Sequence, residues 1–176
     1  MIFQELGISG AYLIDLEKKE DERGFFARAF CSDLFREHRL IDRFVQCNVS
    51  YSHKAGTLRG MHYQLAPHAE VKLIRCTAGA IYDVMIDLRP QSPTYKEWIG
   101  IQIDAIHHQM LYVPEGFAHG FETLVDHTEV TYQVSAPFTP LAERGIRWND
   151  PAFGIEWPLP LAVISNKDSE HPLTKL

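Results

Sequence analysis

The chain has 176 residues, of which 45% are hydrophobic and 23% are charged. These values are ordinary for one soluble globular domain, and they exclude a disordered tail, a collagen and a coiled coil. The formal net charge is −6. Proteins that hold nucleic acid through its backbone are normally basic, so we expect no nucleic-acid partner.

Three further features of the sequence indicate where in the cell the protein is located. No stretch approaches the roughly 20 consecutive apolar residues of a membrane span, so we expect no membrane partner. The first residues carry no basic group and include Glu5, unlike a signal peptide. The cysteines Cys31, Cys47 and Cys76 are odd in number and far apart. They predict free thiols and a cytoplasmic location.

Residues 32–40 are the one segment that we expect to be a helix. Leu34, Phe35 and His38 recur at helical spacing within it, and Ser32 or Asp33 is expected to cap its first turn.

The remaining predicted elements are strands, because apolar residues recur at every second position. We expect them at residues 44–50, 70–76, 80–88, 97–103 and 128–135, separated by turn signals at 54–56, 78–79, 90–93, 114–116 and 137–140. Short strands with few helices predict an all-β fold, a jelly-roll barrel or two-sheet sandwich. No linker divides residues 1–176, so we expect a single domain, and the proline-bearing tail from residue 156 is expected to be rich in loops.

A group of polar residues indicates a pocket inside this fold. Arg59, His62, Gln64 and Lys72 fall on two strands that follow one another in the sequence, with a parity that favours a common interior face. Tyr132, flanked by valines, adds a phenol on a third strand.

A second motif raises the question of a metal. Residues 114–121 resemble the second motif of cupin barrels, in which the histidine, here His119, is often a metal ligand. In the matching first motif, His62 is followed by Gln64 where a second histidine would stand, and Lys72 lies near the expected acid. A metal site needs three or four converging ligands, and an ammonium group repels a divalent ion. We therefore expect no metal, with a metal-dependent cupin enzyme as the more distant alternative.

Taken together, the motifs between residues 21 and 168 resemble the dTDP-4-dehydrorhamnose 3,5-epimerase family. They are Asp21-x-Arg23-Gly24-x-Phe26, Gln46-x-Asn48-x-Ser50, Arg59-Gly60-x-His62-Tyr63-Gln64, Lys72-Leu73, Asp83-Val84, Ser92-Pro93-Thr94, Pro114-x-Gly116-Phe117-Ala118-His119, Trp148-Asn149-Asp150-Pro151 and Ser165-x-Lys167-Asp168. The resemblance implies a cupin-like jelly roll and an isomerase that needs no cofactor. It would epimerise a nucleoside-diphosphate 4-keto-6-deoxysugar at C3, C5 or both, in the biosynthesis of a cell-surface polysaccharide.

The resemblance also implies roles for the catalytic residues. His62 matches the base that removes the proton next to the ketone, and its ordinary pKa of about 6.5 suits that task. Asp168 matches the carboxylate that orients the imidazole. Lys72 matches the cation beside the ketone oxygen, and Tyr132 matches the acid on the opposite face of the sugar.

The substrate-binding residues implied by the resemblance are Arg23, Phe26, Arg28, Gln46, Asn48, Arg59, His119, Phe138, Glu143 and Lys167. The family is dimeric, so the N-terminal segment of about residues 1–40 is expected to pack across a homodimer and to bring Arg23 and Phe26 to the partner's pocket.

Arg28 and Phe138 depart from the family's frequent Glu and Tyr. They leave a CDP- or GDP-linked sugar open beside the dTDP-linked one, as well as inversion at one carbon only. A binding module without catalysis is a further alternative.

Overall fold

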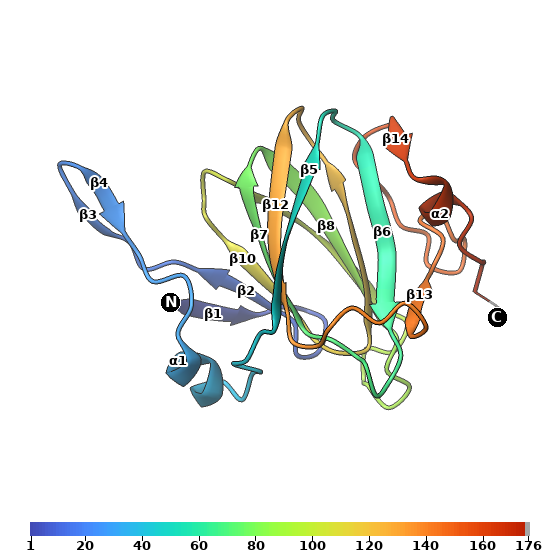
Figure 1. Cartoon of the computed structure of the whole chain (residues 1–176), viewed down its shortest axis with the longest axis horizontal. Helices are drawn as coiled ribbons and strands as arrows, with labels where there is room; N and C mark the ends of the chain where they lie inside the picture. Colours follow the sequence, from blue (N-terminus) through green and yellow to red (C-terminus); the bar gives the residue numbers. More distant parts are fainter. Residues whose placement is uncertain (175–176) are drawn as a thin grey trace.

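The computed structural model describes residues 1–174, and Figure 1 shows two sheets that face each other. The first sheet has the order β1 (Ile2–Glu5), β2 (Tyr12–Asp15), β10 (Met110–Val113), β7 (Lys72–Ala78), β12 (Thr128–Val134) and β5 (Gln46–Ser52). The second has the order β13 (Glu143–Gly145), β6 (Thr57–Gln64), β11 (Phe117–Thr123), β8 (Ala80–Asp87) and β9 (Trp98–Asp104), with β14 (Val163–Ile164) beside β6. A hairpin of β3 (Lys19–Asp21) and β4 (Gly24–Phe26) stands apart.

The all-β, jelly-roll-like prediction is confirmed, but the barrel is not closed. Strand β6 pairs with β11 on one side, and with both β13 and β14 on the other. Both of its edges are therefore occupied, and β5, the strand that precedes it in sequence, ends the opposite sheet. Within residues 1–174 the two sheets thus form an open sandwich rather than a continuous ring of hydrogen bonds.

The strands predicted from period-two patterns are all present, with ends shifted by up to two residues. The alternation of apolar and polar residues along β8 nevertheless gives no sign that its polar residues are buried. Asp83 and Asp87, on the face opposite Val84 and Ile86, are both fully buried. Strand β8 lies between β11 and β9 and is covered on both faces, so its polar residues need internal partners.

Within residues 1–174 there are two short helices, and neither is long and apolar enough to cross a membrane. Helix α1 (Ser32–Glu37) is shorter than predicted, and the expected cap is wrong: Cys31 occupies the N-cap position without a side-chain hydrogen bond. The buried ring of Phe35 holds this helix against the first sheet. Helix α2 (Asn166–Ser169) was not predicted, because four residues are too short to show a period.

The apolar core fills one end of the space between the sheets. It combines side chains from both sheets, among them Ile74, Ile81, Met85, Leu111 and Val130. A second apolar cluster covers the outer face of β8 and β11, where Phe153 and Ile146 from the chain after β13 pack. The other end of the sandwich is lined by polar groups and remains open.

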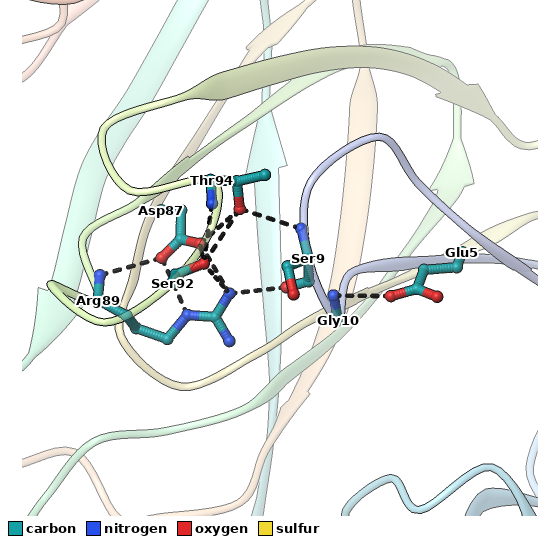
Figure 2. A network of polar contacts seen from close by, with 7 residues as sticks. All are labelled: Glu5, Ser9, Gly10, Asp87, Arg89, Ser92 and Thr94. Carbon is teal, nitrogen blue, oxygen red and sulfur yellow. Dashed lines mark hydrogen bonds and ion pairs between the residues drawn. The ribbon is translucent and has the colours of Figure 1, made fainter.

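A hydrogen-bond network around the buried carboxylate of Asp87 connects the N-terminal strands to the rest of the sandwich, as Figure 2 shows. Asp87 accepts hydrogen bonds from Arg89, Ser92 and Thr94. Arg89 in turn donates to the carbonyl of Ser9 at 2.7 Å, and the N–H of Ser9 donates to Thr94 Oγ1 at 3.2 Å. The turn between β1 and β2 is thereby tied to the loop that follows β8.

Candidate active site

A pocket of about 850 Å³ opens between the two sheets, a size typical of small-molecule sites. Its wall contains most of the predicted site residues, from both sheets and from the C-terminal tail: Gln46, Asn48, Arg59, His62, Lys72, His119, Tyr132, Phe138, Glu143, Lys167 and Asp168. The prediction of an interior polar pocket is confirmed.

His62 and Asp168 form a close pair at the wall of this pocket. The distance from His62 Nε2 to Asp168 Oδ1 is 2.7 Å, although the residues are 106 apart in sequence. Burial alone would raise the pKa of Asp168, but the hydrogen bond and positive charge of His62 and the N–H of Gly60 lower it below its ordinary value. An ionised carboxylate only accepts, so Nε2 carries the proton and Nδ1 is left as the basic nitrogen.

The C-terminal tail delivers Asp168 to this position. Strand β14 runs parallel to β6 and brings the tail beside it. Ser165 then caps α2 by accepting the N–H of Asp168 at 3.0 Å, which fixes the backbone that carries the carboxylate.

Strand β6 departs from regular alternation, and this departure places Arg59 in the pocket. Strict alternation would put Arg59 on the face opposite His62, so the predicted common pocket is reached through an irregularity in the strand. The pairing with β11 shifts register between them. Gly60 lies at the irregularity with φ of +134°, and a Cβ there would lie 2.5 Å from the Cα of Gly120. Glycine is therefore required two residues before His62.

Lys72 approaches the pair from the opposite sheet. Its ammonium lies 3.3 Å from the carbonyl oxygen of His62 and 3.3 Å from a carboxylate oxygen of Glu70. The Lys72 side chain is only 9% exposed, so a cation is held inside the pocket. Glu70, which balances this charge, was not identified from the sequence.

Tyr132 presents a phenol from β12, in the sheet that faces β6. Burial and the negative charge of Glu70 raise its pKa, while Arg59 opposes this effect. The phenol is therefore protonated at neutral pH. A base and an acid thus lie on opposing walls of one pocket.

A second histidine–carboxylate pair lies deeper. His119 Nε2 is 2.8 Å from Asp83 Oδ2, and the His119 side chain is 10% exposed. Burial raises the pKa of Asp83, although His119 and Lys72 oppose the shift. His119 is paired in register with His62 across β11 and β6. Asp83 was noted only as a motif residue in the sequence, and its partner depends on a strand pairing that the motif does not show.

The open side of the pocket carries fixed cations and an aromatic ring. Arg59 donates to the carbonyl of Tyr51 at 2.9 Å, and Lys167 lies 2.6 Å from the carboxylate of Glu143. Phe138 is 56% exposed, and its N–H donates to the side chain of Gln46 at 2.9 Å.

The structure does not bring Arg23, Phe26 and Arg28 to the pocket of their own chain. Arg23 is paired with Asp21, and Phe26 is 70% exposed. Both belong to the β3–β4 hairpin, which projects from the body in Figure 1. Their predicted contact with a partner's substrate stays a prediction.

His171 is a site residue that the sequence analysis missed. Its Nε2 lies 3.7 Å from Asp168 Oδ1, and its ring centroid lies 5.5 Å from that of His62. Burial and the positive charge of His62 lower its pKa. The one available signal was its position three residues after Asp168, although α2 ends at Ser169 and His171 lies beyond it.

Comparison with known proteins gives a consistent result. The family model described as dTDP-4-dehydrorhamnose 3,5-epimerase matches residues 5–175. A dTDP-4-dehydrorhamnose 3,5-epimerase from Sinorhizobium fredii is 44% identical over 173 residues, covering 98% of this chain and 89% of that protein.

Solved structures agree with this match. The dTDP-4-dehydrorhamnose 3,5-epimerase of Bacillus anthracis with TDP and pyrophosphate bound is 43% identical, with a TM-score of 0.94 over 98% of this chain and 99% of that one. An epimerase of Legionella pneumophila in complex with dTDP-4-keto-L-rhamnose is 35% identical, with a TM-score of 0.90 over 98% and 92% of the two chains.

Proposed function

The chain belongs to the dTDP-4-dehydrorhamnose 3,5-epimerase family, and from this premise we propose that it converts dTDP-4-dehydro-6-deoxyglucose into dTDP-4-dehydrorhamnose without a cofactor. The observation that carries the proposal is the pocket itself. Strand β6 carries His62, which is paired with Asp168 of α2. The facing sheet carries the protonated phenol of Tyr132 on β12 and the buried ammonium of Lys72 on β7.

Each chemical step has a residue of suitable character. Nδ1 of His62 removes the proton from the carbon next to the ketone, and Asp168 stabilises the imidazolium that forms. The electron pair moves onto the ketone oxygen, where the buried Lys72 ammonium stabilises the enolate. Tyr132 donates its proton to the opposite face of that carbon as the enolate returns to the ketone. Tyr132 then regains a proton from solvent, and His62 releases to solvent the proton that it removed. Inversion follows because the two groups act from opposing walls.

The nucleotide is proposed to lie over the open side of the pocket. The guanidinium of Arg59 and the ammonium of Lys167 suit the diphosphate, with Gln46 and Asn48 as polar contacts. The deeper His119 is proposed to contact another part of the substrate. We propose that Phe138 stacks on the base and that the hairpin of a second subunit adds Arg23, Phe26 and Arg28, in a homodimer. The three free thiols fit a reducing cytoplasm. The product would then enter the biosynthesis of a cell-surface polysaccharide.

A conversion assay tests the reaction and the nucleotide together. The purified protein is incubated with the 4-keto-6-deoxyglucose linked to dTDP, CDP or GDP, and the products are identified by NMR. We expect conversion of the dTDP-linked sugar with inversion at both C3 and C5. Preference for another nucleotide, or inversion at one carbon, would correct the substrate or the outcome. Absence of any conversion would overturn the proposal.

A further inference from the structure

We propose that His62, Asp168 and His171 form a binding site for a divalent transition-metal ion of the Zn²⁺ class. A bound ion would inhibit epimerisation by preventing His62 from acting as the base. The metal site stands on the geometry alone, whereas the inhibition rests on the proposed function.

The three side chains offer a donor set that suits such an ion. One ligand atom from each of the three side chains lies within 4.8 Å of the other two. Two imidazole nitrogens and one carboxylate oxygen are donors that Zn²⁺, Co²⁺ and Ni²⁺ bind well. This set differs from the cupin motif considered in the sequence, because His171 replaces His119 as the second imidazole.

The distances are close to those of a tetrahedral site. Metal–ligand bonds of about 2.0–2.1 Å at tetrahedral angles place ligand atoms roughly 3.3 Å apart. Asp168 Oδ1 is 2.7 Å from Nε2 of His62 and 3.7 Å from Nε2 of His171. These two distances each differ from the tetrahedral value by about half an ångström, and the two imidazole ligand atoms lie within 4.8 Å of each other.

His171 lacks the partner that a buried imidazole nitrogen requires. Its Nε2 is buried and makes no hydrogen bond within the described chain, a condition that costs free energy. The residue is also held in place: its carbonyl accepts from Arg147 Nε at 2.8 Å, and its ring lies where a Cβ on Gly145 would stand. A metal ion at the Asp168 side would supply the missing partner to an imidazole that is already positioned.

The surrounding charges permit a cation. Lys72 and Lys167 are each paired with a carboxylate, those of Glu70 and Glu143. The carboxylate of Asp168 therefore supplies the negative charge at the proposed metal site. His62 is 33% exposed at the pocket wall, whereas the side chains of Asp168 and His171 are 8% and 11% exposed.

Metal binding and catalysis would exclude each other for a tautomeric reason. In the free protein Nε2 of His62 holds the proton toward Asp168 and Nδ1 is basic. A metal on Nε2 moves the single proton of the neutral ring to Nδ1. No lone pair then remains to remove a proton from the sugar.

The binding test uses the whole protein and needs no substrate. Purified metal-free protein is titrated with Co²⁺, followed by its visible absorption, and with Zn²⁺ by calorimetry. We expect one site per chain, and at least a tenfold loss of affinity in both His171→Leu and His171→Asn, the latter retaining polarity. The matched control is His107→Asn, because His107 is an exposed histidine that also lies three residues from an aspartate, Asp104. Circular dichroism establishes that the variants are folded.

A second arm measures inhibition. Zn²⁺ should abolish epimerisation by the wild type, a chelator should restore it, and the rate of His171→Asn should fall far less relative to its own zinc-free rate. Absence of a stoichiometric site, or equal affinity in the wild type and both His171 variants, would overturn the metal site. Metal binding in a protein without epimerase activity would instead overturn the proposed function.

Discussion

The two histidines of the pocket have carboxylate partners in different surroundings. Asp168 has a lowered pKa, and its partner His62 is 33% exposed, so an incoming ligand can reach that imidazole. Asp83 has a raised pKa, and its partner His119 is 10% exposed. Surroundings that shift the pKa values of two similar groups in opposite directions are typical of acid–base sites. They favour His62 as the base and His119 as a contact.

Replacing Asp168 with Asn tests how the base is held. The amide cannot stabilise an imidazolium, so we expect kcat to fall by about 10²–10⁴-fold with a smaller change in KM. Steady-state kinetics measure this. Asp104→Asn removes the carboxylate from the exposed His107 pair and serves as control. Equal kcat in wild type and Asp168→Asn would rule out the orienting role.

Replacing Tyr132 with Phe separates the two proton transfers. The base remains, so the sugar should still exchange its proton with solvent, whereas delivery to the opposite face should slow. We expect net inversion to fall at least tenfold more than proton loss, within the range for one acid–base group. Parallel NMR measurements of exchange and product formation give the ratio. An equal loss of both rates would contradict the role of Tyr132 as the acid.

The sequence located individual site residues on strands but did not show which distant residues contact one another. The sequence assigned Arg59, His62 and Lys72 to two successive strands, although β6 departs from regular alternation. The pairing of His62 with Asp168 came only from the family resemblance. His171 and Glu70 were missed because their positions depend on how the tail and the loop before β7 fold against β6. Patterns along a chain do not encode such contacts.

At the scale of elements, period-two patterns located β8, β9 and β12 well, because one apolar face faces the core. Two features had no such pattern. The register shift in β6 arises from the close contact of two glycines across β6 and β11. The short strand β14 and helix α2 are held by neighbours rather than by their own propensity.

The network around Asp87 predicts a pH-dependent contribution to stability. Burial would raise the pKa of Asp87, but hydrogen bonds from Arg89, Ser92 and Thr94 lower it to about 2. A carboxylate with a lowered pKa stabilises the fold above its unfolded pKa near 4 and loses this effect as the pH falls toward 2. A shift of this size corresponds to roughly 2 kcal/mol.

Urea unfolding of Asp87→Asn measures this contribution. We expect the difference in unfolding free energy from the wild type to be largest at pH 6 and to shrink as the pH is lowered from 4 to 2. Glu97→Gln, an exposed change nearby, is the control. A difference that does not vary with pH would contradict the account of this network.

At the scale of the whole molecule, the projecting β3–β4 hairpin is the least explained element. It carries Arg23 and Phe26 away from the pocket of its own chain. The proposed homodimer gives these residues a function, because the hairpin would complete the partner's site.

Mixing two inactive variants tests this shared site. Arg23→Ala damages the hairpin contribution, and His62→Asn removes the base. If each pocket combines both chains, mixed dimers contain one intact pocket, so we expect activity to recover toward a quarter of the wild-type value. An inactive mixture, despite mixed dimers detected by native mass spectrometry, would contradict a contribution of Arg23 to the partner's pocket.

The most direct test of the central claim is solvent exchange in D₂O. The protein is incubated with dTDP-4-dehydro-6-deoxyglucose, and deuterium at each sugar carbon is followed by NMR. We predict deuterium at C3 and C5 with the wild type, and none above background with His62→Asn. Epimerised product without deuterium, or exchange at the wild-type rate in His62→Asn, would contradict proton removal by His62.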